Sequence, residues 1–241
     1  LFALGVPAGF QGVVLNLAGL FLLRFIGSLP ESAQAQAAYA VGYGQLFALV
    51  TWTSVGLMGA VATVVGQSLG ARKPERGMAT PFAAARIGVG VATVLAVVFV
   101  AVPGPLFAVF GLADARVVGL GTQLLRFLSV SGLFVTVALT YTGALQGSGD
   151  TRSPLAISCL SQIVVPLGTC FVLQATGRLQ PAGIWAAIVA GHITRAILTV
   201  GRFRQGKWRS IVVPTERLSG RSGGDLEAGC PPSPGSGETP P

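Results

Sequence analysis

Two stretches decide the fold of this chain: QSLGARKP at residues 67–74 and LQGSGDTRSP at residues 145–154. Each one ends a long apolar run and continues into a loop that contains Arg and Pro. The chain as a whole is 51% hydrophobic and only 10% charged, whereas soluble domains have roughly 25% charged residues, and its mean hydropathy is +0.71. A bilayer therefore suits most of the chain better than water, and the sequence predicts a polytopic membrane protein.

A helix needs about 20 mostly apolar residues to cross the hydrocarbon core of a bilayer. Six stretches of this kind run over residues 2–26, 38–69, 84–110, 127–145, 156–173 and 183–200. They are rich in Val, Leu and Ala and lack the polar–apolar alternation of barrel strands. We therefore predict an all-α fold in which six transmembrane helices form one domain over residues 1–209.

The distribution of Lys and Arg predicts the orientation, because basic residues next to a span are retained on the cytoplasmic side. Six spans place both termini on one side of the membrane, together with the second and fourth loops. We expect both termini to be cytoplasmic, in an inner or plasma membrane, and the basic charge to face anionic lipid rather than nucleic acid. That side collects most of the 16 Lys and Arg residues: Arg72, Lys73, Arg76, Arg86, Arg152, Arg202, Arg204, Lys207, Arg209, Arg217 and Arg221.

The two ends of the chain differ in composition. Residues 210–241 are rich in Ser, Gly and Pro, which predicts a disordered cytoplasmic tail because such a segment cannot bury enough apolar surface to fold. The chain begins inside an apolar run and its first methionine is Met58. We therefore expect it to be part of a longer protein.

Further motifs lie along the chain: LGVPAGF at residues 4–10, GLMG at residues 56–59, GQSLGA at residues 66–71, GALQGSGDT at residues 143–151 and RFRQGKW at residues 202–208. In order and spacing they resemble the multidrug and toxic compound extrusion (MATE) family. The resemblance implies twelve helices in two lobes, with this chain as the C-terminal lobe and the N-terminal lobe, or a second half, as its partner. It also implies the export of small organic compounds in exchange for protons or sodium by alternating access, with the ion gradient and no cofactor as the energy source.

None of the eight acidic residues lies in a predicted span, although a cation-coupled transporter usually places a carboxylate within the membrane. One branch of the MATE family has an acid in the first helix of the C-terminal lobe, where this chain has Leu15 or Asn16. The chain therefore resembles the branch of DNA-damage-inducible transporters, whose coupling acid is in the N-terminal lobe. By itself it is expected to show no efflux driven by protons or sodium.

Four polar side chains in the predicted spans are candidates for the wall of a substrate cavity: Asn16, Gln45, Gln162 and His192. Polar residues within a membrane tend to face the interior of a bundle, where they find partners. The alternative is that they only join helices through hydrogen bonds, which are common in bundles. His192 is the only histidine and is also a candidate proton relay.

A second set of candidates belongs to the two opening stretches, which place Gln, Gly and a basic residue in similar order at a constant offset of 79 residues (146 − 67 and 149 − 70). This weak repeat predicts a matched pair of cytoplasmic loops. We expect Asp150 to pair with Arg152 or to cap the next helix. Gly143 and Gly147 have the spacing that lets two helices approach closely. The motif candidates are Gln67, Gly70, Gln146, Gly149, Asp150 and Arg152.

No pattern in the sequence indicates catalysis. Phosphate-binding loops and Ser-His-Asp arrangements are absent, and a lone histidine without ligand-spaced partners predicts no metal site. The three cysteines form no disulfide framework. We therefore expect a transporter and not an enzyme. Two alternatives stay open: a lipid-linked saccharide flippase of the same superfamily, and a transport-inactive half that pairs with a partner lobe.

Overall fold

The computed structural model describes residues 2–206, without the side chains of residues 2–8, 10, 11, 14 and 15. The predicted tail over residues 210–241 lies outside this range. The described elements are all helical, as predicted. They are α1 (Phe2–Gly27), α2 (Ser32–Val41), the π-helix η1 (Gly42–Leu46), α3 (Phe47–Gly70), α4 (Pro74–Ala101), α5 (Pro103–Val109), α6 (Ala115–Gly147), α7 (Arg152–Cys159), the π-helix η2 (Leu160–Val164), α8 (Val165–Ala175) and α9 (Pro181–Arg204).

Five continuous helical segments within the described range are long and apolar enough to cross a membrane. They are Ser32–Gly70, Pro74–Ala101, Ala115–Gly147, Arg152–Ala175 and Pro181–Arg204. The first predicted span coincides with α1, which contributes a shorter apolar stretch over Asn16–Gly27. The chain is therefore an all-α, multi-pass membrane protein, and the predicted number of six spans is approximate.

Several helices extend beyond the spans that hydropathy outlines, because a helix continues through polar residues where its ends are capped. The connection between the predicted spans over residues 38–69 and 84–110 is already helical from Pro74, and proline suits the first turn of a helix. The helix predicted over residues 84–110 ends at Ala101, and α5 begins anew at Pro103 after a non-helical Val102. Asp114 caps α6 by accepting the backbone N–H groups of Arg116 (2.7 Å) and Val117 (3.3 Å), well before residue 127.

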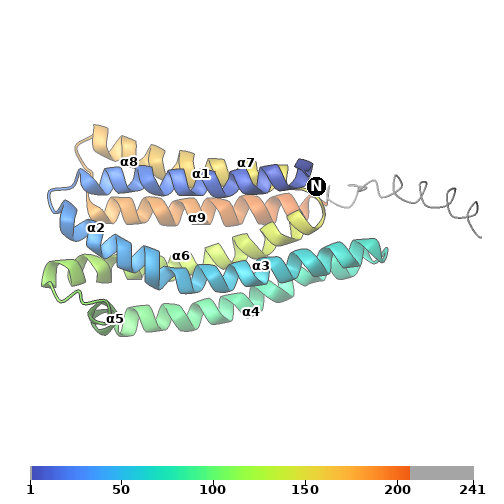
Figure 1. The fold of residues 1–241 in the computed structure, drawn as a ribbon, viewed down its shortest axis with the longest axis horizontal. Coiled ribbons are helices and arrows are strands. Elements are labelled where there is room, and N and C mark those ends of the chain that lie inside the picture. Colours follow the sequence, from blue (N-terminus) through green and yellow to red (C-terminus); the bar gives the residue numbers. More distant parts are fainter. Residues whose placement is uncertain (1, 207–241) are drawn as a thin grey trace, which may run out of the picture. The chain divides into compact units, whose positions relative to one another are not determined.

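Helix α6 holds the bundle together, since it packs against α3, α4 and α9. Figure 1 shows α1, α7, α8 and α9 on one side of the view and α3 and α4 on the other, with α6 between them. Many of its residues are fully buried, including Leu124, Leu125, Ala144 and Leu145. A buried hydrogen bond of 2.8 Å joins Ser54 of α3 to Thr136 of α6.

The backbones of α3 and α6 touch at two glycines. A Cβ atom built on Gly143 would collide with the backbone of Met58, and one built on Gly147 would collide with the backbone of Ala62. The spacing predicted from sequence thus marks a true close approach. Small residues have this role in membrane bundles because dispersion contacts replace the hydrophobic effect as the driving force between helices.

We expect G143A and G147A each to destabilise the bundle by about 1–3 kcal/mol, because overpacked backbones must separate. The measurement is the unfolding midpoint in detergent. G59A is the matched control, since a Cβ atom at this α3 glycine meets nothing within 4 Å. Equal midpoints for G143A and G59A would contradict the assignment of a close contact.

Candidate functional site

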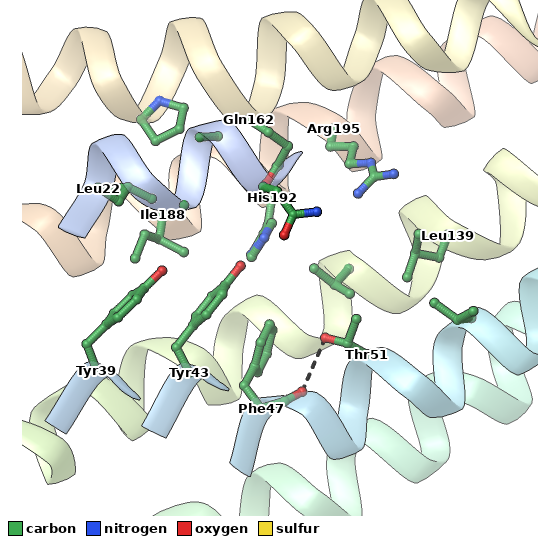
Figure 2. Close-up of a pocket in the computed structure, with 16 residues that line it drawn as sticks. Leu22, Tyr39, Tyr43, Phe47, Thr51, Leu139, Gln162, Ile188, His192 and Arg195 are labelled. Carbon is green, nitrogen blue, oxygen red and sulfur yellow. Dashed lines mark hydrogen bonds between the residues drawn. The ribbon is translucent and has the colours of Figure 1, made fainter. Parts of the chain in front are cut away.

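A cavity of about 300 Å³ opens between α1, α2, η1, α3, α6, η2, α8 and α9. Its wall is mostly apolar and aromatic, with a few polar groups, which is the usual composition of a small-molecule site. Figure 2 shows ten of the lining residues by label. The described lining residues are Asn16, Ala18, Gly19, Leu22, Tyr39, Tyr43, Phe47, Thr51, Val55, Val135, Leu139, Gln162, Pro166, Ile188, His192 and Arg195.

Both π-helices contribute to this wall. Tyr43 belongs to η1 and Gln162 to η2. A π-turn inserts one extra residue into a helix, which changes the direction of the side chains around it, and such turns are frequent at functional sites. Gly191 of α9 lies against the second one: a Cβ atom there would stand 2.6 Å from the carbonyl oxygen of Ser161. The irregular helix and α9 are thus held close beside the cavity.

Stacked rings form one side of the cavity. Tyr39, Tyr43 and Phe47 follow each other at one-turn spacing, with ring centroids 5.1 Å apart for the first pair and 5.4 Å for the second. The stack continues to Trp185 (6.0 Å from Tyr39) and to His192 (5.9 Å from Phe47), both on α9. In Figure 2 the two tyrosine hydroxyls point from their helix toward Ile188 and His192. The stack offers a flat aromatic surface with polar tips.

His192 is 3% exposed and its Nδ1 shares a hydrogen bond with the hydroxyl of Ser131 on α6. Its ring also stacks on Phe47. These contacts fix the orientation of the imidazole by joining α9 to α6 and α3. His192 therefore connects helices and also lines the cavity.

Arg195 follows one turn later on α9 and is 6% exposed. No hydrogen bond or ion pair of its guanidinium occurs among the side chains that the structure describes, and its buried Nε has no partner. The buried Nε2 of Gln162 also lacks a partner. The cavity therefore contains hydrogen-bond donors that nothing in the described part of the chain satisfies.

The structure brings together three of the four predicted cavity residues. Asn16, Gln162 and His192 line the cavity, and Asn16 also donates to the carbonyl of Gly12 (2.9 Å). Gln45 does not line it, because its side chain is exposed on another face of η1.

Sequence reasoning did not select Tyr39, Tyr43, Phe47 and Arg195 as cavity residues. The spacing of the three aromatic residues at i, i+4 and i+8 was the available signal, since it places them on one face of a helix. For Arg195 the available signal was its position inside the predicted span over residues 183–200, since charged residues within a span usually mark a functional site.

A second polar cluster lies where α6 passes into α7. Asp150 is 7% exposed, and it accepts the backbone N–H of Ser153 (3.0 Å) and the hydroxyl of Ser153 (2.7 Å). Arg202 of α9 donates to the same carboxylate through Nη2 (3.0 Å) and Nε (3.2 Å). The prediction of a cap on the next helix is thus confirmed. The predicted pair with Arg152 is wrong, because that side chain is exposed and α9 supplies the partner.

The two opening stretches end their helices in the same way, but not in the register predicted from sequence. After α3, Arg72 adopts φ +55°; its backbone N–H donates to the carbonyl of Leu69, and the backbone N–H of Lys73 donates to the carbonyl of Ser68. After α6, Gly149 adopts φ +89°; its backbone N–H donates to the carbonyl of Gln146, and the backbone N–H of Asp150 donates to the carbonyl of Leu145. Arg72 therefore corresponds to Gly149, an offset of 77 residues (149 − 72) instead of 79.

The likeness of these two stretches reflects a common way of ending a helix. The same left-handed turn follows α5 at Gly111 and α8 at Gly177. Gln67 and Gly70 are the last turn of α3, and Gln146 is in the last turn of α6. Helix termination thus explains the repeat without a shared function of the two loops.

We expect D150N to destabilise the lobe by roughly 2–4 kcal/mol, because it leaves the partly buried Arg202 without a counter-charge. The measurement is the unfolding midpoint of D150N, R202Q and the double variant. R152Q is the control, since Arg152 is exposed. Effects of D150N and R202Q that simply add up in the double variant would contradict a direct pair.

We expect R72G to stabilise the lobe by about 1 kcal/mol, because a left-handed conformation is strained for a residue with a Cβ atom. G149A, which introduces a Cβ atom at the corresponding turn, should destabilise it by a similar amount. Thermal unfolding of both variants tests this prediction. A lower midpoint for R72G would show that the Arg72 side chain makes a stabilising contact that outweighs the strain.

The MatE family model matches residues 7–172, more than half of the chain. The chain belongs to the MATE family. Since MATE proteins are transporters, it belongs to a transporter family and not to a family of enzymes.

The similarity extends to bacterial and mammalian MATE proteins. The chain is 30% identical over 215 residues to a probable multidrug resistance protein NorM from Deinococcus radiodurans, covering 84% of this chain and 45% of that protein. It is 27% identical over 190 residues to multidrug and toxin extrusion protein 1 from Oryctolagus cuniculus, and the match covers 79% of this chain and 32% of that protein.

Among solved structures, the chain has the fold of the eukaryotic MATE transporter AtDTX14, with a TM-score of 0.76 at 21% identity, covering 86% of this chain and 46% of that one. The chain thus spans less than half the length of these relatives. This share is consistent with one lobe of a two-lobe MATE protein. The predicted resemblance to the DNA-damage-inducible branch stays a prediction.

Proposed function

We propose that the chain is the C-terminal lobe of a MATE exporter, which moves drugs or toxic organic compounds by alternating access in exchange for protons or sodium. The observation that carries this proposal is the cavity lined by Tyr39, Tyr43, Phe47 and His192, whose volume of about 300 Å³ suits a small organic molecule or part of one. Family membership supports transport as the activity. The facing lobe would supply the rest of the binding site.

The ion-coupling group belongs to the facing lobe in this proposal. The four acids in the described range are at helix ends: Glu31 pairs with Arg116 (2.8 Å), Glu75 is in the first turn of α4, Asp114 caps α6 and Asp150 pairs with Arg202. None of them lines the cavity. A carboxylate that takes up protons or sodium during transport is therefore expected elsewhere in the complete transporter.

The proposed orientation places the basic end of the lobe in the cytoplasm. In Figure 1 the α3–α4 turn, the α6–α7 turn and the end of α9 lie at the same end of the bundle. Arg72, Lys73, Arg152, Arg202 and Arg204 belong to these segments. Retention of basic residues on the cytoplasmic side supports this orientation, in a plasma or inner membrane.

The flippase alternative has less support. A flippase for lipid-linked saccharides would favour several Arg residues in the cavity, and Arg24 and Arg126 are exposed and do not line it. Only Arg195 does. The transport-inactive half remains a distinct outcome of the experiment that follows.

We expect the complete two-lobe transporter in proteoliposomes to move at least one of two aromatic dyes, cationic ethidium or anionic 1-pyrenesulfonate, when a proton or sodium gradient is imposed, whereas the 241-residue chain alone moves neither. Y43A in the complete transporter should lower transport at least tenfold, because it removes one ring of the cavity stack. W52A is the matched control, since Trp52 is 74% exposed and outside the cavity. Transport by the chain alone, or equal effects of Y43A and W52A, would contradict the proposal.

A further inference from the structure

The charge of the cavity is unusual for an exporter of cationic drugs. With His192 neutral, Arg195 is the only charged side chain among the described residues that line the cavity. The described acids lie at the helix ends, where Glu31 and Asp150 are already paired. A cation would therefore meet repulsion in this lobe, while an anion would meet an attractive group in surroundings of low dielectric.

Arg195 is also incompletely satisfied. Its side chain is 6% exposed, and its Nε has no partner among the described side chains. A buried guanidinium without a counter-charge costs several kcal/mol, and natural proteins almost always offset this cost by an ion pair or by hydrogen bonds. The planar guanidinium matches the two oxygens of a carboxylate, sulfonate or phosphate.

Other donors lie around the same space. The Nε2 of Gln162 is buried without a partner, and the hydroxyls of Tyr39 and Tyr43 point into the space between η1 and α9 (Figure 2). These groups can donate to an oxyanion, and the stack of Tyr39, Tyr43 and Phe47 provides a flat apolar surface for a ring. The cavity thus combines a positive, donor-rich part with an aromatic wall.

We infer that this cavity binds the acidic group of an aromatic organic anion, with Arg195 as the counter-charge and the tyrosine stack as the contact for the ring. The inference rests on the proposed function, since it names the substrate class of the same cavity. The same oxyanion chemistry has a second source, which is a carboxylate of the facing lobe. The experiment separates the two.

The first arm uses the purified chain in nanodiscs of neutral phosphatidylcholine, so that no anionic lipid competes. Equilibrium dialysis measures the binding of 1-pyrenesulfonate and of 1-pyrenemethylammonium, which share a ring system and differ in charge. We expect the wild-type chain to bind the sulfonate at least tenfold more tightly than the ammonium. Equal affinities, or preference for the ammonium, would overturn the inference without any variant.

The second arm tests the residue. R195Q should lower the affinity for 1-pyrenesulfonate at least tenfold and change that for the ammonium little, and R195K should restore part of the loss. R126Q is the matched control, since Arg126 of α6 is exposed and does not line the cavity. Size-exclusion profiles and circular dichroism establish that the variants fold. A folded R195Q that binds the sulfonate as well as R126Q does would overturn the assignment of Arg195.

The third arm uses the complete transporter. If the anion comes from the substrate, the complete transporter also binds 1-pyrenesulfonate and R195Q abolishes this binding. If a carboxylate of the facing lobe occupies the site, the chain alone binds the sulfonate while the complete transporter does not, and the substrate class is refuted. Gradient-driven ethidium transport without sulfonate binding would refute this inference and leave the proposed function intact. Sulfonate binding by a complete transporter that shows no transport would refute the proposed function and leave this inference intact.

Discussion

The close approach of α3 and α6 is the contact on which the rest of the lobe depends. Gly143 and Gly147 let the two backbones touch, and the hydrogen bond between Ser54 and Thr136 joins them further along. In a bilayer, lipid chains compete equally well for apolar side chains, so helices associate through tight packing and buried polar contacts. With this contact in place, α6 is held in the centre, where it also packs against α4 and α9.

The cavity follows from the elements that do not pack so tightly. The π-turns η1 and η2 interrupt two of the helical segments that border the cavity, and Tyr43 and Gln162 of these turns line the same space. Gly191 keeps α9 against η2, while His192 holds it to α6 through Ser131. A regular helix at either place would orient these side chains differently. Local irregularity, supported by a rigid centre, thus makes room for a ligand.

Charge is arranged differently at the ends and in the middle of the lobe. At the ends, Glu31 pairs with Arg116 and Asp150 with Arg202, so that connections are fastened to helices distant in sequence. In the middle, Arg195 faces the cavity without a described partner. An ion pair at an end stabilises the resting fold, whereas an unpaired cation within the membrane is costly and favours binding of an anion.

The sequence by itself determined the membrane class, the helical fold and the MATE family, because long apolar runs and the glycine-rich motifs at their ends are local properties. It also indicated the close contact at Gly143 and Gly147 and the capping role of Asp150, since both depend on spacing within a few residues. Only the tertiary structure decided that Asp150 pairs with Arg202, that Gln45 points away from the cavity, and that Tyr39, Tyr43 and Arg195 share it. The π-turns shift the helical register, and the partners lie on helices far apart in the chain, so periodicity shows which residues share a helix face but not which residues of other helices they meet.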